Sequence, residues 1–212
     1  MPVYKLDHET SYEYSIPVVV SQHLAHLLPR KCSRQTWVSH SLAISPNPSA
    51  TQERVDLFGK RALAFLIDSE HRRFSLKASG EVKVARAEYP SDSLSWESAA
   101  EALAHPATED DWQASFHAFA SPMVNFDDAI RHYALQSFTP DRPLLEAAVD
   151  LNSRINHDFA YSPATTHVGT LPTEILRERR GVCQDFAHLF CAGLRSLGLA
   201  ARYVSGYILT HP

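Results

Sequence analysis

The charge distribution of this sequence is not that of a nucleic-acid-binding protein. Its 212 residues carry a formal net charge of −4 at pH 7, and the sequence pI is about 6.3. Lysine and arginine are not gathered into the basic stripe with which proteins neutralise a phosphate backbone. The composition, 44% hydrophobic and 21% charged, is that of an ordinary globular protein. Nucleic acid is therefore not expected as a partner.

Long apolar runs are missing as well. No apolar stretch approaches the roughly 20 residues that a membrane-spanning helix needs, so no membrane partner is expected. Residues 1–9 read MPVYKLDHE and contain no positive region followed by an apolar one. They therefore do not predict a signal peptide.

Cysteine is scarce: the three cysteines are Cys32, Cys183 and Cys191. An odd number without a CxxC pair favours free thiols in a reducing compartment over a disulfide framework. Cys183 and Cys191 lie eight residues apart on one predicted helix, roughly 12 Å along its axis, which is too far for a disulfide. We therefore expect a cytoplasmic protein with reduced cysteines.

Metal-binding patterns are missing too. His23 and His26 have the i,i+3 spacing of two ligands on one face, but no third ligand lies near them in the sequence. The sequence therefore predicts neither a metal site nor another cofactor.

The first part of the chain predicts strands. Residues at its start alternate between more apolar and more polar side chains, the period of a half-buried strand. The alternating positions are Tyr4, Leu6, His8, Thr10, Tyr12 and Tyr14. Further strands are expected at Thr36–Ile44, Ala62–Ile67 and Phe74–Ala85. Short strands at such regular spacing predict an N-terminal antiparallel β-sandwich domain over residues 1–88.

Helical patterns replace the strands after this domain. Residues 89–142 are expected to form a helical connecting region. Helices are predicted at Pro143–Phe159, Pro172–Arg180 and Cys183–Leu197, and a strand at Leu199–Thr210. The predicted fold class is α+β, with the sandwich followed by a mainly helical core over residues 143–212.

A glycine turn delivers Cys183 to the first turn of a predicted helix. Several backbone N–H groups are unpaired at that end of a helix, and its partial positive charge favours a thiolate. The same N–H groups can bind the oxyanion that forms when sulfur attacks a carbonyl. The alternative is a buried structural thiol, because free cysteine is among the most buried residue types. Cys191, in mid-helix, and Cys32, in a polar stretch, are given no catalytic role.

Two parts of the chain carry family motifs. Residues 171–207, LPTEILRERRGVCQDFAHLFCAGLRSLGLAARYVSGY, resemble the core of the papain-like transglutaminase-like superfamily, with its GxC turn and following ARYVSGY strand. The earlier part is similar to the N-terminal domain of the bacterial branch. Its motifs are H-x-T-x-Y-x-Y from His8 to Tyr14, LLPR at Leu27–Arg30, Gln35, and D-x-F-G at Asp56–Gly59. The usual asparagine after D-x-F-G is Lys60 here.

The resemblance implies a thiol acyl-transfer mechanism on a protein or peptide substrate. Cys183 would attack a glutamine carboxamide or a peptide carbonyl, and the thioester would pass to an amine or to water. In the family a histidine on the next strand is the general base, and an aspartate on the following strand orients it. The match ends at Thr210, before both positions, and His211 looks like the start of a loop. The expected core is thus C-terminally truncated and catalytically impaired.

Two interpretations remain open. The chain is either part of a transglutaminase-like amidase, cysteine protease or acyltransferase, or a non-catalytic module that binds a peptide or protein. A lone strand at Leu199–Thr210 cannot satisfy its own backbone groups, so we expect a homo-oligomer formed through it.

Two further residues are candidates for the site. Gln184 could donate a hydrogen bond to the oxyanion, and Tyr161 corresponds to an aromatic family position that would line the cleft; helix solvation and packing are their respective alternatives. His188 is five residues after Cys183, about 140° further round the helix, which favours a core role. His157 and His167 flank the preceding loop and are expected to have surface roles.

Overall fold

The computed structural model describes residues 2–30, 32–56, 58–86, 90, 93–163, 167 and 169–209. The chain divides into two compact units, Met1–Tyr89 and Pro90–Pro212. The first is built of strands and the second mainly of helices, so the predicted α+β class is confirmed.

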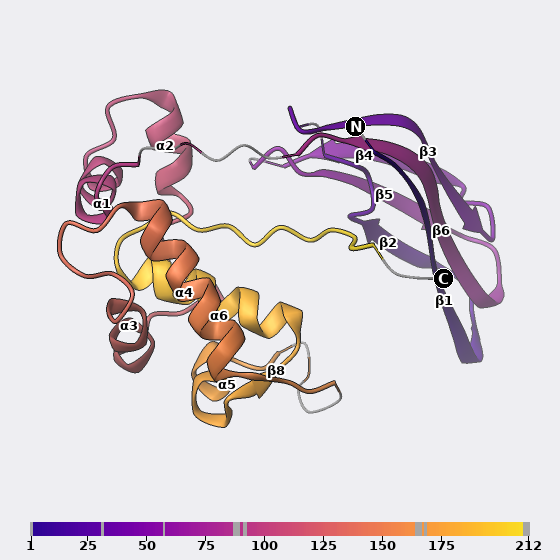
Figure 1. Ribbon diagram of the computed structural model, residues 1–212. Coiled ribbons are helices and arrows are strands. Elements are labelled where there is room, and N and C mark those ends of the chain that lie inside the picture. Colours follow the sequence, from indigo (N-terminus) through magenta and orange to yellow (C-terminus); the bar gives the residue numbers. More distant parts are fainter. Residues whose placement is uncertain are drawn as a thin grey trace. The chain divides into compact units, whose positions relative to one another are not determined.

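The first unit is a two-layered antiparallel β structure. Its described residues form two three-stranded sheets, ordered β1-β6-β3 and β2-β5-β4 (Figure 1). The strands are β1 (Val3–Val18), β2 (Ser21–Ala25), β3 (Gln35–Ser45), β4 (Ala50–Val55), β5 (Arg61–Ile67) and β6 (His71–Val84). Phe74 and Leu76 from one sheet and Phe65 and Ile67 from the other share one buried cluster, so the two sheets face each other across an apolar core.

The alternation predicted at the start of the chain is present in β1. Tyr12 lies directly opposite Phe74 of β6, and Thr10 opposite Leu76. Successive side chains of a strand point to opposite faces, so these residues share the face that is turned to the core. The strand extends to Val18 after a shift in its register beyond Glu13.

The second unit is a helical cluster. Its described helices are α1 (Trp96–Ala104), α2 (Glu109–Ser115), α3 (Asp128–Leu135), α4 (Leu144–Asp158), α5 (Pro172–Glu178) and α6 (Cys183–Ser196). Two short parallel strands, β7 (Ala160–Tyr161) and β8 (Arg180–Gly181), flank α5. Capping residues explain where two of the helices begin. The Asp127 carboxylate at the start of α3 accepts hydrogen bonds from the N–H groups of Ala129 and Ile130, and Thr108 at the start of α2 forms a capping box with Asp111.

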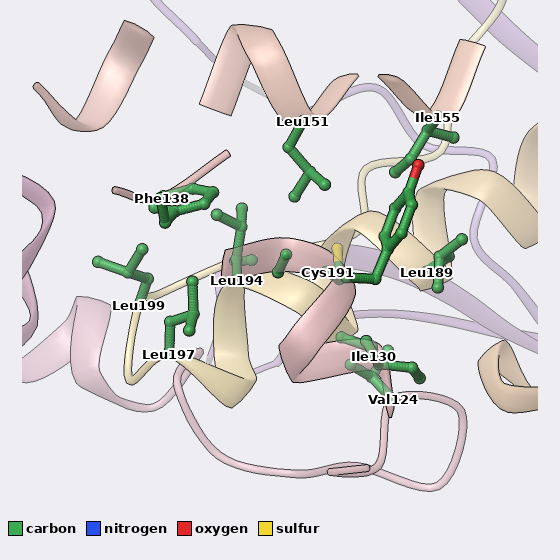
Figure 2. Close-up of a cluster of buried hydrophobic side chains, with 14 of the residues drawn as sticks. Val124, Ile130, Phe138, Leu151, Ile155, Leu189, Cys191, Leu194, Leu197 and Leu199 are labelled. Carbon is green, nitrogen blue, oxygen red and sulfur yellow. The ribbon is translucent and has the colours of Figure 1, made fainter. Parts of the chain in front are cut away.

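Helix α6 runs through the core of the helical unit. It packs against α3, α4 and α5, and Figure 2 shows its residues Leu189, Cys191 and Leu194 among Ile130, Leu151 and Phe138. Gly193 allows the helices to approach closely, because a Cβ there would lie 3.3 Å from Ala134 and 3.4 Å from Leu151. Cys191 is buried as predicted, and burial raises the pKa of its thiol.

The strand predicted over Leu199–Thr210 is wrong for residues 199–209; Thr210 lies outside the described residues. The segment begins anchored, with the N–H of Ala201 donating to the His117 carbonyl at 3.1 Å, and it then continues without helix or strand. A strand needs a neighbour for its backbone groups, and no described strand of the helical unit pairs with this segment.

Among the described residues, no helix combines the length and the apolar character needed to cross a membrane.

Candidate active site at the start of helix α6

Cys183 is the first residue of α6 and is exposed to solvent. Val182 before it is extended, with φ −114° and ψ 176°. The first intrahelical bond runs from the N–H of Phe186 to the Val182 carbonyl at 3.1 Å. The N–H groups of Cys183 and Gln184 therefore precede the regular hydrogen bonding of the helix, where backbone donors are available to an anion. Gln184 is half-buried at the second helical position.

The carboxylate of Asp185 holds the turn that leads to Cys183. It accepts a hydrogen bond from the N–H of Val182 at 2.8 Å, and Asp185 is only 2% exposed. A Cβ on Gly181 would lie 2.9 Å from Asp185 Oδ2 and 3.3 Å from the ring of Phe186. Only a glycine leaves room for this buried carboxylate beneath the turn. From the sequence, Asp185 is explained by the polarity of a helix start alone. Its hydrogen bond to Val182 has no local signal, because a valine at position 182 leaves the usual pair of polar capping residues incomplete.

The short β7–β8 pair brings Tyr161 beside the nucleophile turn. Tyr161 is the register partner of Gly181, two residues before Cys183. The N–H of Ser162 donates to the Gly181 carbonyl at 2.9 Å, and that of Ala160 to the Arg179 carbonyl at 2.9 Å. Tyr161 is exposed. The structure thus places Tyr161 close to the turn before Cys183, although no local sequence pattern indicates the strand pairing that does so.

Arg179 anchors the other side of this turn. It adopts the left-handed conformation, with φ 55°, directly after α5. Its guanidinium lies over the rings of Tyr133 and Phe159, 5.1 Å and 4.9 Å from their centroids. Cation–π contacts of this kind are stronger where water is partly excluded. They tie the segment that carries Gly181 to α3 and to the end of α4.

Tyr133 is the centre of this polar cluster. Its hydroxyl donates to the Asp158 carboxylate at 2.9 Å, and a second guanidinium, that of Arg154, lies 4.4 Å from its ring centroid. Burial, followed by the hydrogen bond to Asp158, raises the pKa of Tyr133 to about 12. Hydrogen bonds from His157 and Tyr133 lower the pKa of Asp158.

The histidines near the site have other surroundings. His188 is buried on α6 with its ring centroid 5.1 Å from that of Tyr203, and burial lowers its pKa. His157 contacts Asp158 at 3.0 Å, and His167 Nδ1 accepts from the N–H of Gly169 at 3.1 Å. In the described part of the chain, no histidine ring is hydrogen-bonded to Cys183.

Two known protein families match this chain. Residues 4–83 match the family described as Bacterial transglutaminase-like N-terminal region, and residues 131–212 match the Transglutaminase-like superfamily. The chain belongs to the transglutaminase-like superfamily, with the bacterial N-terminal region ahead of the core.

Several mycobacterial proteins are similar to this chain along almost its whole length. Uncharacterized proteins from Mycobacterium bovis and Mycobacterium tuberculosis are 38% identical over 214 residues, which is 99% of this chain and 67% of each relative. One from Mycobacterium leprae is 30% identical over 206 residues, 97% of this chain and 70% of that protein. The chain thus spans about two thirds of the length of these relatives.

A solved structure supports the fold. It is the crystal structure of a candidate cysteine protease from Cytophaga hutchinsonii, with a TM-score of 0.70 and 18% identity. The match covers 93% of this chain and 64% of that one.

Proposed function

We propose that this chain carries the nucleophile of a thiol acyl-transfer enzyme, with Cys183 as the attacking group. The observation that carries the proposal is the place of Cys183: it is the first residue of α6, it is exposed, and a buried carboxylate holds the turn before it. The unpaired N–H groups at the start of a helix can stabilise negative charge that develops during the reaction. The family assignment and the exposed Tyr161 beside the turn support the same conclusion.

The proposed chemistry is attack on the carbonyl carbon of a glutamine carboxamide or of a peptide bond. The C–S bond forms, the C–N bond breaks, and ammonia or an amine leaves with a proton. The negative oxygen of the tetrahedral intermediate lies within reach of the N–H groups at the start of α6, to which the Gln184 amide could add a donor. The thioester then passes its acyl group to water or to an amine.

We further propose that both acylation of Cys183 by an amide and turnover are slow in this 212-residue chain. Complete turnover requires a general base that takes and returns a proton. The buried His188 lies against Tyr203, and His157 and His167 have the partners given above. By resemblance to the family, its histidine and aspartate correspond to positions after Thr210.

A non-catalytic peptide-binding module is the second candidate function. The observation that favours it is that, among the described residues, no histidine is hydrogen-bonded to Cys183. The two functions differ in whether Cys183 is more reactive than another exposed thiol. Free Cys32, Cys183 and Cys191 also support a reducing, cytoplasmic location as part of either proposal.

Alkylation by iodoacetamide at pH 7, followed by peptide mass spectrometry, tests the enzymatic proposal. Cys32 is the internal control because it is exposed like Cys183 but belongs to no helix. We expect Cys183 to react at least several-fold faster than Cys32, and Cys191 to react most slowly because it is buried. Equal rates at Cys183 and Cys32 would reject an activated nucleophile and favour the binding module.

A further inference from the structure

The N-terminal sandwich contains a cavity of about 340 Å³ that lies far from Cys183 in the sequence. It is lined by residues of both sheets. The lining residues are Thr10, Tyr12, Tyr14, His23, Leu24, Ala25, Leu27, Phe65, Phe74 and Leu76. The volume is within the range of roughly 300–1,000 Å³ that is typical of ligand pockets.

Four aromatic rings form a continuous stack along this cavity. The ring of Tyr12 stacks on that of Phe74, with 5.7 Å between their centroids. The imidazole of His23 also stacks on the Phe74 ring, with 4.3 Å between the centroids. His23 also stacks on Phe65 at 4.9 Å. The interplanar angles of these three contacts are 16°, 16° and 20°. The stack crosses from one sheet to the other, and all four rings belong to residues that line the cavity.

The cavity has almost no charge. Of the described lining residues, His23 alone titrates near neutral pH. Burial and, to a lesser extent, the nearby His71 lower its pKa, which favours the neutral ring. Its ring is hydrogen-bonded to the Ser21 hydroxyl at 2.9 Å, and Ser21 in turn is 3.5 Å from His71 Nε2. A charged group would therefore lose its hydration without gaining a partner of opposite charge.

The cavity is open to solvent on the side of strands β1 and β2. Tyr12 lines it and yet is 51% exposed. Tyr12 belongs to β1 and His23 to β2, and each of these strands is the outermost of its sheet. The opening thus lies between two sheet edges.

The edge beside the opening can accept another strand. Among the described strands, β2 pairs only with β5. Its other edge presents backbone N–H and C=O groups, a template for an added strand. Ile16 near the end of β1 and Val19 and Val20 in the connection to β2 are also exposed, so further apolar side chains lie just before this strand in the sequence. A small molecule in the cavity would use neither feature.

We propose that the N-terminal sandwich binds an extended peptide, which adds a strand along the edge of β2 and inserts an uncharged aromatic side chain into the cavity lined by Tyr12, His23, Phe65 and Phe74. Main-chain hydrogen bonds along the edge supply affinity, and the pocket selects the side chain, as in other cases of strand addition. The inserted ring joins the stack. This site does not depend on Cys183 acting as a nucleophile.

A peptide titration of the ¹⁵N-labelled chain, followed by NMR, tests the proposal. The probe is a capped pentapeptide with a central phenylalanine flanked by valines, and matched peptides carry glycine or lysine at the centre. Because burial removes the phenylalanine ring from water, the phenylalanine peptide should bind at least about tenfold tighter than the glycine peptide. Shift changes should concentrate on Ser21–Ala25 and on the amides of Tyr12 and Phe74.

Matched variants locate the peptide on the sheet. Tyr12→Asp places a charge at the opening and should weaken the phenylalanine peptide at least about tenfold. Val55→Asp is the control, because Val55 is 68% exposed on β4, the opposite edge of the same sheet. Tyr12→Ser is a second variant at the opening, and the NMR spectrum of each variant reports whether it is folded. Cys183→Ala should leave binding unchanged, whether or not Cys183 is catalytic.

Several results would overturn the proposal. If the glycine peptide bound as tightly as the phenylalanine peptide, the cavity would not be the binding pocket. If the lysine peptide bound more tightly than the phenylalanine peptide, the cavity would bind cations and not aromatic rings. A capped single phenylalanine that binds as tightly as the pentapeptide would show that the β2 edge is not used. The same shifts produced by raising the protein concentration alone would identify a second copy of the chain as the occupant.

Discussion

Gly181 and Asp185 are in such close contact that a side chain at position 181 has no room. A Cβ on Gly181 would lie 2.9 Å from Oδ2 and 3.0 Å from Cβ of Asp185. The same carboxylate accepts the hydrogen bond from Val182, one residue before Cys183. The position of the proposed nucleophile is therefore determined by the packing of two residues that would not themselves take part in the chemistry.

Replacing Gly181 by alanine should destabilise the protein and reduce the reactivity of Cys183. The added methyl group must displace the buried carboxylate, and overpacking of this kind costs about 1–3 kcal/mol. Gly206→Ala is the matched control, because a Cβ there meets nothing within 4 Å. Urea unfolding measures the stability of both variants, and iodoacetamide alkylation the reactivity of Cys183. Equal stability of the two variants would contradict the contact.

Removing the carboxylate should have a similar effect for another reason. In Asp185→Ala the N–H of Val182 loses its acceptor, and a buried unsatisfied donor costs about 1–3 kcal/mol. Asp185→Asn retains an acceptor oxygen, so it should recover part of that loss. The free energy of unfolding of the three proteins gives the comparison. An alanine variant as stable as the asparagine variant would show that the hydrogen bond contributes little.

Much of the architecture could be predicted because its signals are local. The alternation in β1 and the helical spacing in α4 are properties of contiguous residues, and the polar cap at Asp127 and the proline at position 172 mark helix starts. The start of α6 at Cys183 follows from the glycine turn. The family motifs gave the superfamily, which the family matches confirm.

The elements that were missed depend on tertiary contacts or have no pattern. All six residues of β4 (Ala50–Val55) are exposed, so the strand shows no apolar alternation. The β7–β8 pair is two residues long on each side and forms only because α5 returns the chain. The predicted end of α5 at Arg180 is two residues later than the observed end at Glu178. The helix ends earlier because Arg179 adopts the left-handed conformation and its guanidinium contacts two aromatic rings. The error at Leu199–Thr210 arose because strand propensity does not supply a partner strand.

Stability at alkaline pH should depend on Tyr133. Its pKa in the folded protein is about 12, raised from 10.0. Between these values the unfolded chain releases the phenolic proton while the folded protein keeps it, so stability present below pH 10 is lost as the pH rises toward 12. Thermal unfolding from pH 9 to 12 should show a smaller decline in Tyr133→Phe than in the wild-type chain. An identical decline in both proteins would exclude this linkage.

Arg195 should be essential to the packing of the helical unit. Its buried guanidinium donates to the Ala201 carbonyl at 2.7 Å and 2.9 Å, to the Phe119 carbonyl at 3.0 Å and to the Ser121 hydroxyl at 3.0 Å. Replacing Arg195 by methionine leaves these acceptors without a donor, which should cost at least about 2 kcal/mol.

The control for Arg195 is Arg177→Met. The Arg177 side chain is exposed, and its ion pair is with Glu178, a contact expected to contribute less than about 1 kcal/mol. Urea unfolding of both variants measures the difference. Comparable losses in the two would show that the buried network is not what holds residues 119–121 and 201 to α6.

Self-association of the 212-residue chain should proceed through residues 203–209. This extended segment exposes Val204, Tyr207, Ile208 and Leu209, and an apolar extended backbone tends to pair with another strand. Light scattering at high concentration should report a mass above that of the monomer. Ile208→Asp, at a position that is 82% exposed, should shift the chain toward the monomer, because the new charge opposes apolar pairing. Val149→Asp, on the exposed face of α4, is the control and should not. A strict monomer at every concentration, or equal effects of the two substitutions, would show that this segment is not the contact.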